Sequence, residues 1–205
     1  MSTTTPALPD RHLDLGCGVS PRNPYGRREL CGVDIRPLAS TTPQAELRCA
    51  NVVLDPIPYP DSSFGSVSAY DFIEHVPRLL TTPDGRATWF PFVRLMNEVW
   101  RVLAPGGTLY ALTPAYPSPA AFVDPTHVNL ITDRTHEYFC GAQPLGEIYG
   151  FVGAFRATRV EWVVYLDSLV AAPLTTRQKL RLMHRRWRGR LTHVLWELEA
   201  VKTGR

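Results

Sequence analysis

Residues 12–20 combine a short apolar run with two closely spaced glycines, and this pattern constrains the fold more than any other part of the chain. It predicts a buried strand that ends in a tight turn at Gly16 and Gly18, with Asp14 near the end of the strand. Glycine leaves no side chain above the backbone, so a ligand can lie directly on the main chain. A second predicted strand also ends in an acidic residue, Asp34. This layout indicates a nucleotide-type site at the carboxyl edge of a parallel sheet.

The alternation of strand-like and helix-like segments predicts the fold class. A helix-like segment at residues 86–103 precedes the fifth strand, and two late strands follow an aperiodic block. We expect strands at residues 11–15, 30–35, 47–53, 66–70, 108–113, 155–166 and 192–201. This order indicates an α/β fold with a seven-stranded, mainly parallel sheet and an antiparallel edge strand.

The segment between the first two predicted strands is too short for an ordinary crossover helix. Pro21 and Pro24 leave room for hardly more than one helical turn before the next strand begins. Pro21 also stands where a dinucleotide-binding G-x-G-x-x-G turn would have its third glycine. We therefore expect a short or missing first crossover helix, and the turn fails the dinucleotide fingerprint.

The composition is ordinary for a globular domain. Of the 205 residues, 44% are hydrophobic and 20% are charged. No stretch approaches the roughly 18 apolar residues of a membrane span, and the four cysteines form no CxxC pair, so we expect a reduced, cytoplasmic protein. We predict one domain over residues 1–205, with a loose tail at residues 1–10 and an aperiodic substrate cap at residues 114–153.

Basic residues are concentrated in one segment. Residues 177–190 hold seven Lys or Arg and no Asp or Glu, whereas the other 15 basic residues are outnumbered by the 19 acidic ones. The simplest interpretation is the solvated face of an amphipathic helix over residues 175–191, packed by Leu180, Met183 and Trp187. The alternatives are contact with an anionic substrate or RNA, or peripheral contact with a membrane surface. Nucleic acid is disfavoured because the segment lacks interleaved aromatic residues.

Five short motifs, in order, resemble those of class I S-adenosylmethionine-dependent methyltransferases of the methyltransferase type 11 kind. They are LDLGCG (residues 13–18), GVD (32–34), IPYPDSSF (57–64), IEHV (73–76) and RVLAPGG (101–107). The resemblance implies a Rossmann-like sheet and S-adenosylmethionine as the cofactor. Gly65 stands where the family usually has Asp, a departure that concerns the start of a strand.

The resemblance also implies that the cofactor lies on the glycine turn and on neighbouring strand ends. Asp14 would favour the ammonium group, Asp34 would accept the ribose hydroxyls, and Asp71 would lie near the methionine moiety. Asn51 would read the adenine edge. The implied cofactor-binding residues are Asp14, Gly16, Cys17, Gly18, Asp34, Ile35, Asn51 and Asp71. A turn-capping role remains the structural alternative for the carboxylates of the first two strands and for Asn51.

Methyl transfer to a hydroxyl group requires that the acceptor lose its proton, so a nearby base is expected. His127, in the aperiodic block, is the first candidate, because an imidazole can accept a proton near neutral pH. Asp124 could orient it, and His75 is a second candidate base. The structural alternatives are a loop-fixing role for His127 and a packing role for His75. Asp124, His127 and Asp133 could ligate a divalent ion, but their spacing does not demand one, and no metal is predicted.

The segment Asp124–Val128 resembles one found in bacterial methyltransferases that act on sugars and glycans. The sequence therefore predicts an S-adenosylmethionine-dependent O-methyltransferase whose acceptor is a hydroxylated small molecule, such as a sugar, a glycan end or a glycosylated natural product. Two alternatives stay open: an N-methyltransferase acting on RNA or a small amine, and a non-catalytic cofactor-binding subunit. The short first crossover also makes a homodimer an expectation.

Overall fold

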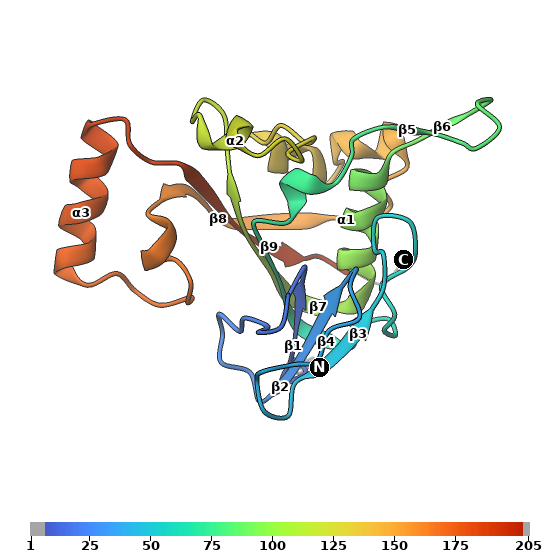
Figure 1. Cartoon of the computed structure of the whole chain (residues 1–205), viewed down its shortest axis with the longest axis horizontal. Coiled ribbons are helices and arrows are strands. Elements are labelled where there is room, and N and C mark those ends of the chain that lie inside the picture. Colours follow the sequence, from blue (N-terminus) through green and yellow to red (C-terminus); the bar gives the residue numbers. More distant parts are fainter. Residues whose placement is uncertain (1–6, 203–205) are drawn as a thin grey trace, which may run out of the picture.

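A seven-stranded sheet forms the centre of the molecule, and the computed structural model describes residues 7–202 (Figure 1). Most of the predicted tail, residues 1–10, lies outside this range. The sheet has the order β3-β2-β1-β4-β7-β9-β8. Its strands are β1 (Arg11–Leu15), β2 (Glu29–Asp34), β3 (Glu46–Cys49), β4 (Phe64–Tyr70), β7 (Leu103–Pro114), β8 (Phe155–Val163) and β9 (His193–Ala200).

Only β9 runs against its neighbours among these seven strands. It pairs antiparallel with β7 and with β8, whereas β1, β2, β3, β4 and β7 pair in parallel. The predicted α/β class and the mainly parallel, seven-stranded, Rossmann-like sheet are confirmed. The antiparallel strand lies one place inside the edge, because β8 forms the edge itself.

The first crossover contains no helix within its described residues, 16–28, as the two prolines predict. Asn23 closes this loop instead: its side chain accepts from the Arg27 amide at 3.0 Å and donates to the Arg27 carbonyl at 2.7 Å. Irregular chain therefore covers the adjoining sheet face. Tyr25 packs edge-on against Tyr110 of β7, with ring centroids 5.8 Å apart.

The opposite face carries the helix α1 (Pro91–Val102). Its apolar side chains recur at helical spacing and are buried against the sheet, and they are Phe92, Leu95, Met96, Val99 and Val102. The prediction placed the helix start at residue 86, which is wrong. Residues 80–89 instead form a small hairpin of β5 (Leu80–Thr81) and β6 (Thr88–Trp89), and Pro91 occupies the first turn of the helix, where its missing N–H costs nothing.

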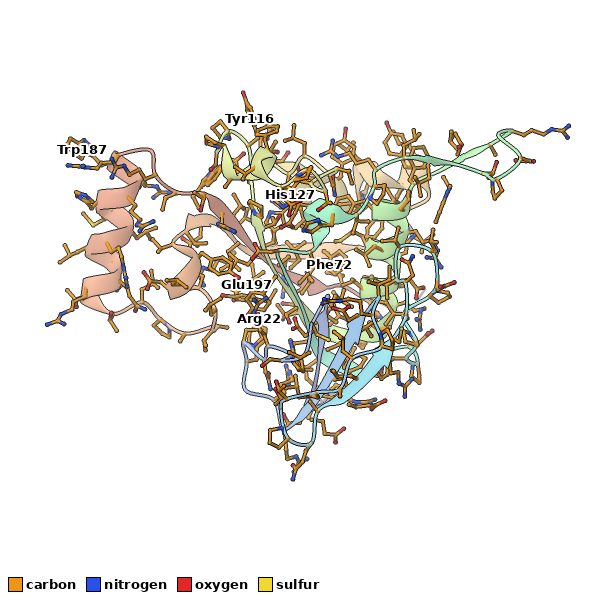
Figure 2. All side chains as sticks on the ribbon, in the orientation of Figure 1. Arg22, Phe72, Tyr116, His127, Trp187 and Glu197 are labelled. Atoms are coloured by element: carbon orange, nitrogen blue, oxygen red, sulfur yellow. The ribbon has the colours of Figure 1, made fainter. Side chains whose placement is uncertain are left out.

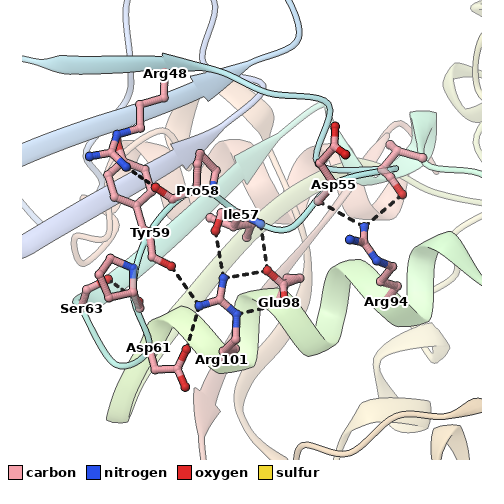
Figure 3. A network of polar contacts seen from close by, with 12 residues as sticks. Arg48, Asp55, Ile57, Pro58, Tyr59, Asp61, Ser63, Arg94, Glu98 and Arg101 are labelled. Atoms are coloured by element: carbon pink, nitrogen blue, oxygen red, sulfur yellow. Dashed lines mark hydrogen bonds and ion pairs between the residues drawn. The ribbon is translucent and has the colours of Figure 1, made fainter.

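Arg101 of α1 ties the connector after β3 to the helix (Figure 3). Its guanidinium donates to the carbonyls of Ile57 and Tyr59, both at 2.9 Å, and pairs with Asp61 at 2.8 Å and Glu98 at 2.7 Å. Glu98 in turn accepts from the Ile57 amide at 2.8 Å. The IPYPDSSF and RVLAPGG motifs are therefore joined by the side chain of Arg101. The connector begins earlier than predicted, because β3 ends at Cys49 and not at residue 53.

The segment after β7 crosses the carboxyl edge of the sheet with little regular structure. It contains α2 (Ala120–Val123) and the 3₁₀ turns η2 (Thr135–Phe139) and η3 (Leu145–Tyr149). Phe139 anchors it by packing against Phe92 and Phe151, with ring centroids 5.3 and 5.2 Å apart. The predicted cap boundaries, residues 114–153, stay a prediction.

The basic helix α3 (Thr176–Trp187) is the clearest departure from the expected packing. Its apolar residues Leu180, Met183 and Trp187 are 60%, 65% and 81% exposed, so the prediction that they pack against the body is wrong. Figure 1 shows α3 standing apart from the sheet, after the 3₁₀ turn η4 (Tyr165–Asp167). Among the described residues, no helix has the length and apolar character needed to cross a membrane.

Candidate active site

The turn after β1 needs glycine for two separate reasons. Gly16 and Gly18 have φ angles of +65° and +56°, which L side chains rarely adopt. A Cβ at Gly16 would also lie 2.5 Å from a ring carbon of Phe72, whereas a Cβ at Gly18 would meet nothing within 4 Å. The backbone at Gly18 is therefore open to a ligand, whereas Gly16 packs against Phe72 in the segment after β4 (Phe72 is labelled in Figure 2).

Asp14 is buried beneath this turn, and both of its carboxylate oxygens have partners. Oδ1 accepts from the Ser68 hydroxyl at 2.5 Å, and Oδ2 accepts from the Arg22 amide at 2.8 Å. Burial raises the pKa of Asp14 to about 7, against the opposing effect of these hydrogen bonds. The carboxylate thus fixes the start of the first crossover, and a cationic group placed beside it would favour its ionised form.

A buried chain of polar groups leads to Asp14 through the sheet. Arg27 Nε donates to Ser66 Oγ at 2.9 Å, Ser66 contacts His12 Nδ1 at 2.7 Å, and His12 Nε2 contacts Ser68 Oγ at 2.8 Å. Burial, aided by the charge of Arg27, lowers the pKa of His12 to about 3, so the imidazole is neutral. With Nε2 protonated, every donor in the chain points toward Asp14, which fixes its carboxylate as an acceptor.

Asp34 ends β2 and is already occupied by protein groups. Its Oδ2 accepts from the Gly18 amide at 3.0 Å, and its Oδ1 pairs with Arg36 Nε at 3.0 Å. Burial opposes ionisation, but the hydrogen bonds from Arg36 and Gly18 hold the pKa of this carboxyl below its usual value. Arg36 itself is exposed, so a ribose diol could replace its guanidinium without disturbing the core.

Three other predicted cofactor residues take different places around the turn. The Cys17 thiol faces away from the open side, since a Cβ at Gly32 would lie 2.5 Å from its sulfur. Asn51 Oδ1 accepts from the Val53 amide at 3.2 Å and so caps a local turn. Ile35 is exposed just beyond Asp34. Cys17 can therefore contribute only its backbone, whereas Ile35 is free to contact a ligand.

Asp71 lies directly after β4 in a left-handed conformation, with φ at +46°. Its Oδ1 is 3.0 Å from Nε2 of His193, the first residue of β9, whose ring lies 4.7 Å from that of Tyr165. Burial opposes ionisation, but hydrogen bonds from His193 and Tyr165 lower the pKa of Asp71. The Arg22 guanidinium reaches the Tyr165 hydroxyl at 3.4 Å. No motif in the sequence points to His193 or Tyr165, which lie in β9 and in the 3₁₀ turn η4.

The predicted catalytic residues do meet in space. The rings of His75 and His127 are 4.8 Å apart and nearly perpendicular. Asp124, however, does not contact the His127 ring: it accepts from Thr126 Oγ1 at 2.6 Å, and Thr126 contacts His75 Nδ1 at 2.9 Å. The Asp124 carbonyl accepts from the His127 amide at 3.1 Å, so the expected orientation of His127 by Asp124 stays a prediction that would act through the backbone. The side chain of Asp124 acts through Thr126 on His75, and the Ala121 carbonyl, 3.3 Å from Nδ1, faces His127.

Glu74 completes this cluster and was not predicted as a site residue. Its Oε2 accepts from Thr113 Oγ1 at 2.9 Å, while its buried Oε1 has no hydrogen-bond partner among the described residues. Burial raises the pKa of Glu74 to about 8. Ligand atoms of Glu74, His75 and His127 lie within 4.8 Å of one another, a set that suits a divalent transition metal. Asp133, named as a ligand from the sequence, instead faces the Trp162 indole at 3.4 Å.

Each member of the cluster keeps one unused polar atom. The contacts above occupy Glu74 Oε2 and both Nδ1 atoms, which leaves Glu74 Oε1, His75 Nε2 and His127 Nε2. These atoms lie in the segments that follow β4 and β7, at the same sheet edge as Asp14 and Asp34. The edge therefore carries an acidic glycine turn and, beside it, a group able to accept or donate protons.

Comparisons with known proteins agree with this geometry. Residues 13–111 match the family described as a methyltransferase domain. No curated protein matches the sequence. A methyltransferase of Haloferax volcanii, solved in complex with the Trm112 methyltransferase activator, superposes with a TM-score of 0.59 at 16% identity, over 96% of this chain and 85% of that one.

Two further solved structures share the fold. A methyltransferase of Bacillus halodurans has a TM-score of 0.52 at 15% identity, over 96% of this chain and 95% of that one. An S-adenosylmethionine-dependent methyltransferase of Archaeoglobus fulgidus has a TM-score of 0.53 at 16% identity, over 93% and 85% of the two chains. Residues 13–111 therefore form a methyltransferase domain, with S-adenosylmethionine as its expected cofactor, within a chain whose whole fold is that of the solved methyltransferases.

Proposed function

We propose that the enzyme transfers a methyl group to a hydroxyl group of a small molecule, such as a sugar, a glycan end or a glycosylated natural product. The unused Nε2 of His127, beside His75 and Glu74 at the cofactor edge of the sheet, carries this proposal. A neutral amine acceptor needs no base at the moment of transfer, whereas a hydroxyl acceptor does. A base held at this edge therefore favours oxygen as the acceptor atom.

The residues around the turn fit S-adenosylmethionine by their donor and acceptor chemistry. Asp14 offers a carboxylate for the ammonium group, Asp34 offers two oxygens for the ribose diol once Arg36 moves aside, and Gly18 leaves the backbone open. When bound, the cofactor supplies a methyl group on a positively charged sulfur. Asp71 is ionised at neutral pH, since His193 and Tyr165 lower its pKa, and a charge there would favour the sulfonium side of the cofactor.

His127 then has one task, which is to accept the acceptor's proton at Nε2 as the new bond forms. The Ala121 carbonyl, facing Nδ1, selects the tautomer with the proton on Nδ1 and leaves the Nε2 lone pair free. The Thr126–Asp124 pair holds His75 in the same way, through its Nδ1. His75 thus forms one wall of the site, and positioning of the hydroxyl against this wall supplies the rest of the rate.

The test is a methylation assay with the isolated chain across a panel of hydroxylated substrates. The His127→Ala variant should lose about 10²–10⁴-fold in turnover with its cofactor affinity unchanged. His184→Ala, which alters an exposed histidine of α3, is the matched control and should behave like the wild type. Wild-type turnover and pH profile in His127→Ala would reject the base and favour an amine acceptor. Cofactor binding with no methyl transfer to any class of acceptor would favour a non-catalytic subunit.

A further inference from the structure

The helix α3 has an apolar face that nothing in the described chain covers. Leu180, Met183 and Trp187 are 60%, 65% and 81% exposed. The helix is held to the body on its other side, where Arg181 and Gln178 reach the Asp167 carboxylate at 2.6 and 3.3 Å. A capping box between Thr175 and Gln178 satisfies the amides of its first turn, so the start of the helix is fixed without packing.

The exposed apolar residues form a stripe with basic residues along both sides. At about 100° per residue, Leu180, Met183 and Trp187 fall within about 60° of one another on the helix wheel. Lys179 and Arg186 flank this stripe on one side, and Arg177 and Arg188 flank it on the other. The half-buried Leu182 lies opposite the stripe, toward the body. This arrangement is typical of a helix that lies in the plane of a membrane surface.

Exposed apolar residues also lie near the candidate base, in the segment after β7. Trp187, at the end of α3, and Tyr116, at the start of the segment after β7, both lie at the upper edge of the view in Figure 2, and His127 lies just below Tyr116. Tyr116, Phe122 and Val123 are exposed. The helix α3 itself runs down the left side of the view in Figure 1, so only its Trp187 end lies toward the edge that carries Tyr116.

We propose that α3 binds the surface of an anionic lipid membrane, with Leu180, Met183 and Trp187 in the headgroup layer and the flanking cations on the lipid phosphates. Seven cations and no acidic residue lie between 177 and 190, and among the described residues only Arg181 pairs with a carboxylate, so the other six complement such a surface. Two copies of α3 facing each other would instead bring like charges together. An RNA would satisfy the arginines but would leave the apolar stripe in water. This inference does not depend on the methyl acceptor.

The test is co-sedimentation of the full chain with phosphatidylglycerol vesicles, compared with phosphatidylcholine vesicles. The wild type should bind the anionic vesicles at low salt and bind the neutral ones at least tenfold more weakly. Replacing the stripe (Leu180→Gln, Met183→Gln and Trp187→Gln together) should weaken binding more than tenfold. Replacing two flanking charges (Lys179→Gln with Arg188→Gln) should weaken it by about fivefold for each charge.

The matched control is Leu145→Gln with Ile148→Gln, which removes two exposed apolar residues of η3 and should leave vesicle binding unchanged. Calorimetry with S-adenosylhomocysteine and thermal melting verify that every variant is folded. Three results would overturn the proposal. They are equal binding to both vesicle types, undiminished binding by the stripe variant, and absence of vesicle binding by the wild type. In the last case, a stripe variant that is monomeric where the wild type is dimeric would assign the stripe to a dimer interface. Salt-dependent RNA binding in place of vesicle binding would also overturn the proposal.

Discussion

Two groups of polar side chains share the carboxyl edge of the sheet, and they differ in how their hydrogen bonds are completed. Around the glycine turn, all four carboxylate oxygens of Asp14 and Asp34 accept hydrogen bonds from the protein. In the cluster of Glu74, His75 and His127, each side chain keeps one unused atom. The first group is preorganised by the chain itself, as suits a cofactor of constant shape. The second group has polar atoms that only a bound molecule or ion could satisfy.

The largest expected effect tests whether the cluster is a base or a metal site. If His127 acts as a base, treatment with a chelator should leave turnover unchanged. Added Zn²⁺ should then lower turnover at least 100-fold, because Glu74, His75 and His127 would ligate the ion and occupy the Nε2 lone pair. Mg²⁺, which prefers carboxylate and water oxygens, is the control and should not inhibit. Loss of activity on chelation, with recovery on adding zinc, would show that the cluster requires a metal ion.

The glycine turn offers a matched pair of substitutions. Gly16→Ala should lower the free energy of unfolding by about 3 kcal/mol, because its methyl group meets the Phe72 ring in addition to the backbone strain. Gly18→Ala has the strain alone and should cost about 1 kcal/mol, but its methyl group projects into the open space and should weaken cofactor binding. Denaturant unfolding and calorimetry measure the two effects. Equal stability losses in both variants would contradict the Phe72 contact as the cause.

Asp14 predicts a pH dependence of cofactor affinity. Because burial raises the pKa of its carboxyl to about 7, the free enzyme must release a proton before Asp14 can pair with an ammonium group. Affinity for S-adenosylhomocysteine should therefore fall about tenfold for each pH unit below 7, and should fall again above about 8 as the ligand's amino group loses its proton.

The Asp14→Asn variant supplies the control for this profile. It should bind more weakly and lose the dependence below pH 7. The free energy of unfolding of the wild type should also fall relative to that of Asp14→Asn as the pH rises. A carboxyl whose pKa is raised on folding stabilises the protein below its unfolded pKa of 3.8, and that contribution is lost as the pH rises through about 7. The wild type should therefore lose stability relative to Asp14→Asn between pH 4 and pH 8, by up to about 4 kcal/mol. If the stabilities of the wild type and Asp14→Asn, measured by thermal melting, changed equally across this pH range, Asp14 would not titrate as stated.

The sequence named the carboxylates of the first group and two side chains of the second, His75 and His127, but it gave no sign of contacts that join distant parts of the chain. Asp14, Gly16, Gly18 and Asp34 lie in short motifs whose geometry depends on neighbours along one or two strands. His193 lies far along the chain from Asp71, and only the pairing of β7 with β9 brings the two together. No periodicity in the sequence encodes that contact.

Burial inside strands is a second source of missed residues. His12 carried no recognisable motif, yet polar residues in buried strands must find partners, and His12, Ser66 and Ser68 find one another across β1 and β4. For the helix α3, by contrast, the sequence predicted packing that the structure does not have. Its amphipathic spacing predicted the helix correctly, but spacing alone does not say which apolar face is covered, and Leu180, Met183 and Trp187 remained exposed.

The smallest expected effect concerns Arg36, and it decides whether Asp34 is the ribose site. The guanidinium holds the carboxylate in the free protein, so a ribose diol must displace it. Such an ion pair, whose guanidinium is exposed to solvent, contributes little to stability. Arg36→Gln should therefore tighten S-adenosylhomocysteine binding by up to about fivefold, whereas Arg28→Gln, which removes an exposed arginine paired with Asp10, should change nothing. Weaker binding in Arg36→Gln would mean that Arg36 itself contacts the ligand, and unchanged affinity in Asp34→Ala would place the ribose elsewhere.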